Sequence, residues 1–345
     1  MEHQQVISGK ALIGEDLSLR QVDIVIDNGL ITAIEENQKA PDIWICPALF
    51  NAHTHLGDTI AMDCAITGDL VTLTTPPHGL KHQILEKTPR RTLVRGMITS
   101  IAHMAHRGTG GCADFREGGT EGVAALREAC GGFDFRCLIF GRDGGENSAD
   151  GLGISSTRDV PDVEHCVAHA RRENKLIAFH AGEKDADDID TALSFNPDLI
   201  IHGTYATRAQ LRECADRSIP IAICPRSNWI LGVTSTTMRP PVSLMHELGC
   251  RVFLGTDNAM FVQPDMLAEM AFVHTIYRLE PDDVIRIAVA GSSLTNNPFF
   301  IKVGERANLF AIDPRFSNLR FSGNIAASIV KRGFSGSIRT NVFNS

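Results

Sequence analysis

The sequence predicts a closed (β/α)8 barrel with a small β-sandwich built from both ends of the chain. Between residues 46 and 293, eight apolar strand candidates alternate with amphipathic helices, a pattern typical of a parallel sheet with helical crossovers. Both ends of the chain contain short β-branched runs and turn residues instead. The length of 345 residues suits a barrel of about 250 residues with a smaller appended domain. We therefore expect a barrel over residues 48–302 and a composite sandwich from residues 1–47 and 303–345.

The N-terminal segment is predicted to contain a hairpin. Asp27-Asn-Gly29 separates two β-branched runs, Ile24–Ile26 and Leu30–Ile34, and an Asn-Gly pair favours a tight β-turn. β character returns after Phe300, so strands from the two ends can pair with each other. The predicted C-terminal strands are Ala307–Asp313, Ala326–Val330 and Gly336–Val342.

The barrel strands are the apolar runs in the middle of the chain. Chemistry in such a barrel takes place at the carboxyl ends of the strands, so the residues that end these runs are the first site candidates. Only a short Gly-rich link separates the third run from the fourth. The eight runs are Cys46–His55, Gly111–Phe115, Phe135–Gly141, Gly151–Ser155, Leu176–Gly182, Leu199–Thr204, Ile219–Pro225 and Arg251–Asp257. The predicted helices are Arg90–His106, Pro161–Asn174, Ala209–Arg217, Asp265–Leu279 and one from Pro281 to about Ser293.

Residues 57–89 contain no predicted helix or strand of substantial length. They do contain several glycines and prolines. A loop of this length in a compact domain is usually functional, which indicates a lid or a wall of a binding site. The alternative is an insertion with little order of its own.

Composition excludes several classes of protein. A net charge of −8 without a basic block argues against a nucleic-acid partner. Nine scattered cysteines without a Cys-x-x-Cys pair indicate reduced thiols in a cytoplasmic protein. No apolar run approaches the 18 residues of a membrane span, and the N-terminus does not resemble a signal peptide.

Five ionisable side chains lie at the ends of four strands of this predicted barrel. His53 and His55 are two residues apart and therefore point to one face, while His180, His202 and Asp257 end three later strands. Neutral imidazole and carboxylate are the usual ligands of zinc, so a divalent cation is expected among them. Three histidines and an aspartate leave one position for water, whose pKa a metal lowers from 15.7 to about 7.

Three residues have candidate catalytic roles. Asp257, bound to the metal, either accepts a proton from the water or hydrogen-bonds the nucleophile. Glu183, three residues after His180, is placed to move protons between the nucleophile, a ring nitrogen and the leaving group. His202 either binds the metal or, as we prefer, hydrogen-bonds the attacking water.

Three motifs resemble those of a known superfamily. Pro47-Ala-Leu-Phe-Asn-Ala-His-Thr-His-Leu56 is similar to the first-strand motif of the amidohydrolase superfamily. His180-Ala-Gly-Glu183 and Cys224-Pro-Arg-Ser-Asn228 resemble motifs of its deaminase branch, which includes adenosine, adenosylhomocysteine, guanine, cytosine and triazine deaminases.

The resemblance implies one metal ion, zinc in the first place and iron as the alternative. It also implies that Glu183 is the general acid/base and that His202 orients the water. Neither strand three nor strand four ends in the bridging Lys of dinuclear members. Barrels of this kind are commonly homo-oligomers, so we expect one here. The implied ligands are His53, His55, His180 and Asp257.

Seven further residues are candidate substrate contacts. Asp114, Arg116 and Glu117 lie at the end of the second strand, Arg226 and Asn228 at the end of the seventh, and His78 and His82 in residues 57–89. For the charged residues at strand ends the alternative is a set of salt bridges at the rim. His165 and His169 lie four residues apart on a predicted helix outside the barrel, so we interpret them as structural.

The predicted activity is removal of an amino group, as ammonia, from a heterocycle such as a nucleobase, a nucleoside or a related purine, pyrimidine or pterin. Metal-bound hydroxide would attack the amino-bearing carbon. The first alternative is a hydrolase that opens a cyclic amide or cleaves another C–N bond on the same scaffold. The second is a barrel without enzymatic activity, in which the metal only stabilises the fold.

Overall fold

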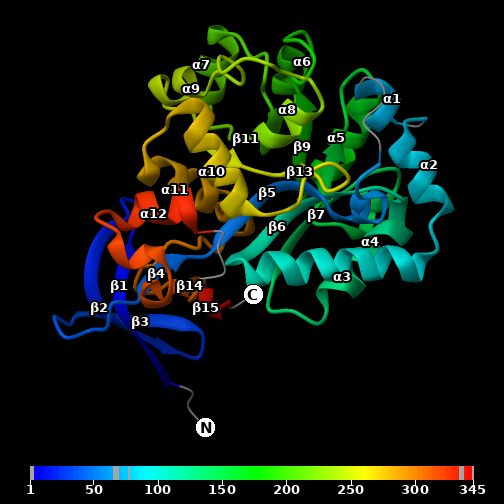
Figure 1. Ribbon diagram of the computed structural model, residues 1–345. Helices are drawn as coiled ribbons and strands as arrows, with labels where there is room; N and C mark the ends of the chain where they lie inside the picture. Colours follow the sequence, from blue (N-terminus) through cyan, green and yellow to red (C-terminus); the bar gives the residue numbers. More distant parts are fainter. Residues whose placement is uncertain (1–3, 65–69, 77, 334–337, 344–345) are drawn as a thin grey trace.

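A closed barrel of parallel strands forms the centre of the computed structural model, which describes residues 4–64, 70–76, 78–333 and 338–343 (Figure 1). Every strand pair recorded in this sheet is parallel. Its strands, in sheet order, are β12 (Val252–Leu254), β11 (Ile221–Ile223), β10 (Leu199–His202), β9 (Leu176–Ala181), β8 (Gly151–Ile154), β7 (Arg136–Gly141), β6 (Thr109–Arg116), β5 (Leu49–His55) and β13 (Asp257–Asn258).

The segment that closes the barrel is the predicted strand Arg251–Asp257, which the structure divides into β12 and β13. β12 pairs with β11, while β13 pairs with β5 on the other side. Between the two, the Gly255 amide donates to the Ile223 carbonyl and the Thr256 amide to the His53 carbonyl, each at 3.0 Å. One short segment thus bonds to both neighbouring strands. The predicted (β/α)8 barrel is confirmed.

Amphipathic helices follow the strands and cover the outside of the barrel. α3, for example, buries Val94, Met97, Ile101 and Met104 at helical spacing. The short link between β7 and β8 holds only the 3-10 helix η2 (Gly145–Ser148). None of the described helices is both long and apolar enough to cross a membrane. The helices are α3 (Arg90–His106), α4 (Gly119–Cys130), α5 (Val163–Arg172), α6 (Ile189–Ser194), α7 (Arg208–Asp216), α8 (Pro225–Ile230), α9 (Val242–Glu247), α10 (Met266–Tyr277) and α11 (Pro281–Ala290), with η3 (Gly291–Thr295) after the last.

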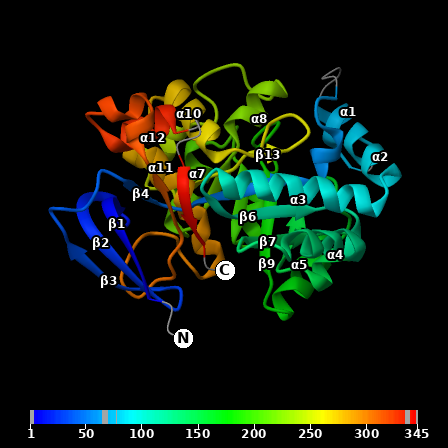
Figure 2. The ribbon, with the colours of Figure 1, turned by 60° about the horizontal axis from the view of Figure 1, so that its bottom comes forward.

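The two ends of the chain meet in a six-stranded sheet beside the barrel (Figure 2). Asn28 and Gly29 adopt φ of 49° and 80°, as a two-residue hairpin turn requires, so the predicted hairpin is confirmed. β14 pairs antiparallel with β4, which joins the C-terminal part to the N-terminal part. The strands, in sheet order, are β15 (Ile338–Val342), β14 (Leu309–Ile312), β4 (Trp44–Pro47), β1 (Gln4–Ile13), β2 (Ser18–Asp27) and β3 (Leu30–Glu36).

One predicted strand was wrong. Residues Ala326–Val330 lie inside α12 (Ile325–Arg332). The Asn324 side chain accepts a hydrogen bond from the Ala327 amide at 2.9 Å and so caps the helix. Ala326, Ile329 and Val330 are buried at a spacing that fits a helix. A short apolar run does not by itself distinguish the two conformations, and here the cap and the packing favour the helix.

Two other regions differ in detail from the prediction. The run Cys46–His55 is interrupted at Ala48, so its first residues belong to β4 in the terminal sheet and the remainder to β5 in the barrel. Residues 57–89, where we expected no helix or strand of substantial length, contain most of η1 (Leu56–Ala61) and two short helices, α1 (Leu70–Thr74) and α2 (Leu80–Lys87). These elements lie between β5 and α3.

We expect Gly255→Ala to destabilise the protein by about 1–3 kcal/mol. A Cβ at this position would lie 2.7 Å from the His53 amide nitrogen, a backbone atom that moves only with the barrel strand. Chemical denaturation followed by circular dichroism measures the loss. Gly132→Ala is the matched control, because a Cβ there meets nothing within 4 Å. Equal unfolding midpoints for the two variants would contradict this account of barrel closure.

Candidate active site

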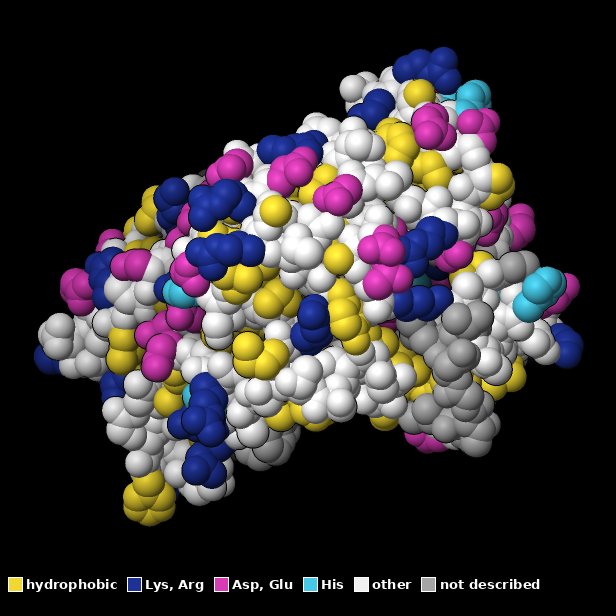
Figure 3. Space-filling view, turned by 90° about the horizontal axis from the view of Figure 1, so that it is seen from above, with side chains coloured by type: hydrophobic (Ala, Val, Ile, Leu, Met, Phe, Trp, Pro, Cys, Tyr) yellow, Lys and Arg dark blue, Asp and Glu magenta, His cyan; other side chains and the backbone are white. Residues whose placement is uncertain are grey.

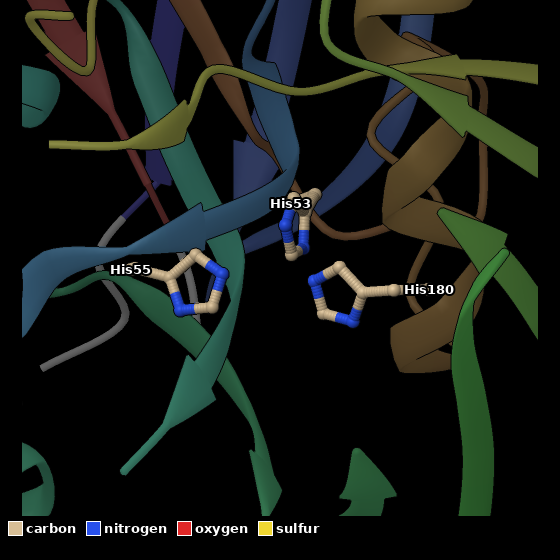
Figure 4. A group of neighbouring side chains, drawn as sticks. All are labelled: His53, His55 and His180. Carbon is tan, nitrogen blue, oxygen red and sulfur yellow. The ribbon is translucent and has the colours of Figure 1, made fainter. Parts of the chain in front are cut away.

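Three histidine rings from two strands point toward one another at the mouth of the barrel (Figure 4). His53 and His55 come from β5, and His180 from β9. The ring centre of His53 lies 4.9 Å from that of His55 and 4.8 Å from that of His180. One nitrogen from each of the three rings lies within 4.8 Å of the others. The structure therefore brings together the three histidines that the sequence predicted as ligands.

The predicted carboxylate ligand joins this group from the closing segment of the barrel. Asp257 Oδ1 lies 3.2 Å from His53 Nε2 and 3.6 Å from His55 Nε2. His53, His202 and Asp257 form a second set whose ligand atoms lie within 4.8 Å of one another. The four predicted ligands and His202 thus gather around one region.

Backbone carbonyls fix the orientation of two of the rings. His55 Nδ1 lies 3.1 Å from the Phe115 carbonyl oxygen, and His180 Nδ1 lies 2.9 Å from that of Ile154. A carbonyl only accepts, so each Nδ1 carries the hydrogen and each Nε2 keeps its lone pair. This arrangement is typical of histidines that bind a metal through Nε2.

Burial sets the charges of these groups. It lowers the pKa of His55 to about 3 and also lowers the pKa values of His53 and His180. Burial opposes ionisation of Asp257, but the hydrogen bond with His53 outweighs it and holds the pKa of Asp257 well below its usual value. The Nδ1 atom of His53 is buried without a hydrogen-bond partner. Neutral imidazoles beside a carboxylate are a suitable donor set for a divalent cation such as zinc.

The backbone is strained where two of these residues lie. His202 and Asp257 adopt φ of 75° and 62°, in the left-handed region that side chains other than glycine rarely occupy. Such conformations persist where the surrounding structure imposes them, and they cluster at functional sites. Ser227 Oγ holds Asp257 from the far side by donating to Oδ2 at 2.5 Å.

Glu183 lies beside the cluster, on the loop after β9. Gly182, at φ 71°, turns the chain, and its amide donates to Asp188 Oδ1 at 2.8 Å, which fixes the loop. Glu183 Oε1 lies 3.7 Å from His202 Nε2. Burial raises the pKa of Glu183, while the nearby His202 acts in the opposite direction. A carboxyl group with a raised pKa is suited to proton transfer.

A cavity at the mouth of the barrel contains several of the predicted groups. His55, His180, Glu183, His202 and Asp257 line it. Sequence reasoning missed other lining residues, among them Lys81, Arg142, Ser155, Ser156, Arg158 and Lys184. On the face shown in Figure 3, basic and acidic side chains gather around a hollow, as expected for the mouth of such a cavity.

The predicted substrate contacts at the end of β6 are buried and do not line this cavity. Asp114 accepts a hydrogen bond from the Leu56 amide at 2.6 Å, and burial raises its pKa to about 7. Arg116 donates to Glu117 Oε2 at 2.5 Å. Of the two readings left open for these residues, the structure favours ion pairs.

The other four predicted contacts also lie away from the cavity that holds the ligands. Arg226 donates to the buried Glu269 at 2.5 Å. Asn228 donates to Thr204 Oγ1 at 2.8 Å, and His82 Nε2 to the Thr74 carbonyl at 3.1 Å. The exposed His78 lines a separate hollow over α1 and α2. The structure thus does not support these side chains as substrate contacts.

Two residues beside the predicted site escaped sequence reasoning for different reasons. Lys81 lies in residues 57–89, where no periodic pattern indicated a buried face. Ser227 could have been predicted, since it lies between Arg226 and Asn228 in a motif already singled out.

The charge of Lys81 also affects its buried neighbour Glu117. Burial would raise the pKa of Glu117, but Lys81 and other cations lower it well below its usual value.

Comparison with known proteins places the chain in a family. The model of the adenosine deaminase family matches residues 147–299. A putative aminohydrolase of Methanothermobacter thermautotrophicus is 31% identical, over 95% of this chain and 94% of the relative.

Solved structures agree on the fold. An adenosine deaminase from Xanthomonas campestris with bound zinc superimposes with a TM-score of 0.81 at 16% identity, covering 96% of this chain and 90% of that one. The zinc complex of atrazine chlorohydrolase TrzN from Arthrobacter aurescens gives 0.81 at 15% identity, covering 98% and 94%. The solved structures support only the fold, whereas the sequence relative and the family model support the family. The chain belongs to the amidohydrolase superfamily, in its deaminase branch.

Proposed function

We propose that this protein is a metal-dependent aminohydrolase. It removes an amino group from an amino-substituted nitrogen heterocycle, such as a nucleobase, a nucleoside or a related purine, pyrimidine or pterin, and releases ammonia. The observation that carries the proposal is the convergence of His53, His55, His180 and Asp257 with Glu183 at their side. The adenosine deaminase family model and the aminohydrolase relative support the reaction class.

His53, His55, His180 and Asp257 would hold one divalent cation, with zinc as the first candidate because the superimposed deaminase binds it. Such a cation lowers the pKa of a water ligand to about 7 and so supplies a nucleophile at neutral pH. The nine cysteines are all free, which suits a reducing compartment, and we propose a cytoplasmic location.

The chain's own residues would move the protons. Glu183 would take one proton from the attacking water and deliver it to the ring nitrogen next to the amino-bearing carbon. The second proton of that water, accepted by Asp257 or Glu183 as the C–N bond breaks and the C=O bond forms, would pass to the amine, which leaves as ammonia. The raised pKa of Glu183 eases the alternation between the two protonation states. His202 hydrogen-bonds the water and orients it, while Ser227 keeps Asp257 in place.

The experiment that tests the proposal is a screen of the metal-loaded protein against purines, pyrimidines, pterins, triazines and nucleosides. Ammonia release, detected with a coupled assay, is the expected result. Ring opening without ammonia would identify a hydrolase of cyclic amides instead, and absorbance spectra of the product distinguish the two.

Glu183→Gln is expected to retain the metal but to lower kcat by about 10²–10⁴-fold, since the amide cannot transfer the proton. Steady-state kinetics and metal analysis of the same sample measure both quantities. Glu173→Gln, at an exposed position outside the cavity, serves as the control and should behave as the wild type. Near-normal turnover of the Glu183 variant would refute the role.

The same substitution is expected to stabilise the metal-free protein at neutral pH. Burial raises the pKa of Glu183 in the folded state, so ionisation above the ordinary value near 4.5 opposes folding. The stability difference should appear as the pH rises through the raised pKa and vanish below the unfolded value. Thermal unfolding of both proteins between pH 4 and pH 8 tests the sign. A variant less stable than the wild type at neutral pH would contradict it.

Removing the metal with a chelator is expected to abolish turnover and to lower Tm, because a ligand that binds only the folded state stabilises that state. Added zinc should restore both. His180→Ala should weaken metal binding more than about a hundredfold, beyond the loss typical of an outer-shell partner. The exposed His165→Ala is the control. Full activity after verified metal removal would contradict the proposal.

A further inference from the structure

Lys81 is the one buried residue of α2 among those described, and its environment is unusual for a lysine. Lysine is rarely buried completely unless it is paired. Its side chain is only 4% exposed, and Nζ lies 2.7 Å from Glu117 Oε1 and 2.9 Å from Asp58 Oδ2. The segment between β5 and α3 thus inserts a positive charge into the interior beside the barrel.

Glu117 connects this lysine to the metal centre. Glu117 Oε1 lies 3.0 Å from His55 Nδ1, the ring nitrogen that carries the hydrogen. A carboxylate on the outer nitrogen of a metal-binding histidine orients the ring and raises its basicity. Lys81, Glu117 and His55 therefore form a continuous chain of short contacts from α2 to a predicted ligand.

The position of the Glu117 carboxylate depends on cations from three elements. Arg116 Nη2 lies 2.5 Å from Oε2, and Arg142 Nη2 lies 2.7 Å from Oε1. Arg116 is the last residue of β6 and Arg142 directly follows β7, whereas Lys81 comes from α2. Removing one partner of a buried charge pair leaves the other charge uncompensated, so the carboxylate should shift or recruit water when the lysine is lost.

We propose that Lys81 is a positioning residue, which holds Glu117 on His55 and so couples the docking of α2 to metal binding. Coupling of this kind is reciprocal: a docked α2 strengthens metal binding, and bound metal favours the docked α2. The inference depends on the metal site of the proposed function, although not on the substrate. It assigns the segment between β5 and α3 a role in assembling the site.

The test is a comparison of Lys81→Met and Lys87→Met in the full-length protein. Lys87 lies on the same helix and is exposed, which makes it a matched control. Zinc affinity is measured by competition with a chelator, and cobalt spectra report the ligand geometry. For Lys81→Met we expect affinity to fall about 10- to 100-fold, a changed cobalt spectrum and faster hydrogen exchange in α2. Lys87→Met should match the wild type in all three.

A double-mutant cycle separates positioning from a general loss of stability. Glu117→Gln should weaken zinc binding by a similar factor, and the double variant should lose no more than Glu117→Gln alone, because both act through one chain of contacts. Additive losses, or a Lys81→Met protein with wild-type affinity and cobalt spectrum, would overturn the inference while leaving the proposed function intact. A wild type that binds no zinc would overturn both.

Discussion

Burial of several ionisable groups at one end of the barrel is the constraint on which the rest of the structure depends. Burial lowers the pKa values of His53, His55 and His180, so these rings lie together as neutral bases beside the carboxylate of Asp257. Burying polar groups is unfavourable unless each finds a partner. A cation bound by their lone pairs would supply that partner, and the fold brings the donors together from separate strands.

The residues that close the barrel also bring the groups of the site together. The Thr256 amide donates to the carbonyl of His53, which joins the last strand segment to the first ligand residue. Gly255 lets the two backbones approach this closely, and the left-handed conformation of Asp257 then turns its carboxylate toward His53. The closing strand is broken into β12 and β13 because it bonds to a different neighbour on each side.

The convergence of the predicted ligands could be anticipated because strand ends can be recognised in a sequence and all strand ends of a parallel barrel meet at one mouth. Side-chain contacts that form only through tertiary packing could not be predicted from the sequence. Arg226 follows a strand as a substrate contact would, yet it faces Glu269, a residue far along the chain. Lys81 lies in a segment without periodicity, and nothing local indicates that its charge is buried against Glu117. The apolar run Ala326–Val330 is compatible with either a strand or a helix, and the cap formed by Asn324 favours the helix.

The terminal sheet contributes to the site through the same strand that carries two ligands. Only Ala48 separates β4 from β5, and its amide donates to the Asn308 carbonyl at 2.9 Å. Strand β5 is therefore anchored at its start by a sheet built from both ends of the chain. At its end, the residues that follow lead into the segment that carries Lys81. His53 and His55 thus lie between two anchors outside the barrel, and the appended elements help to determine where the ligand nitrogens point.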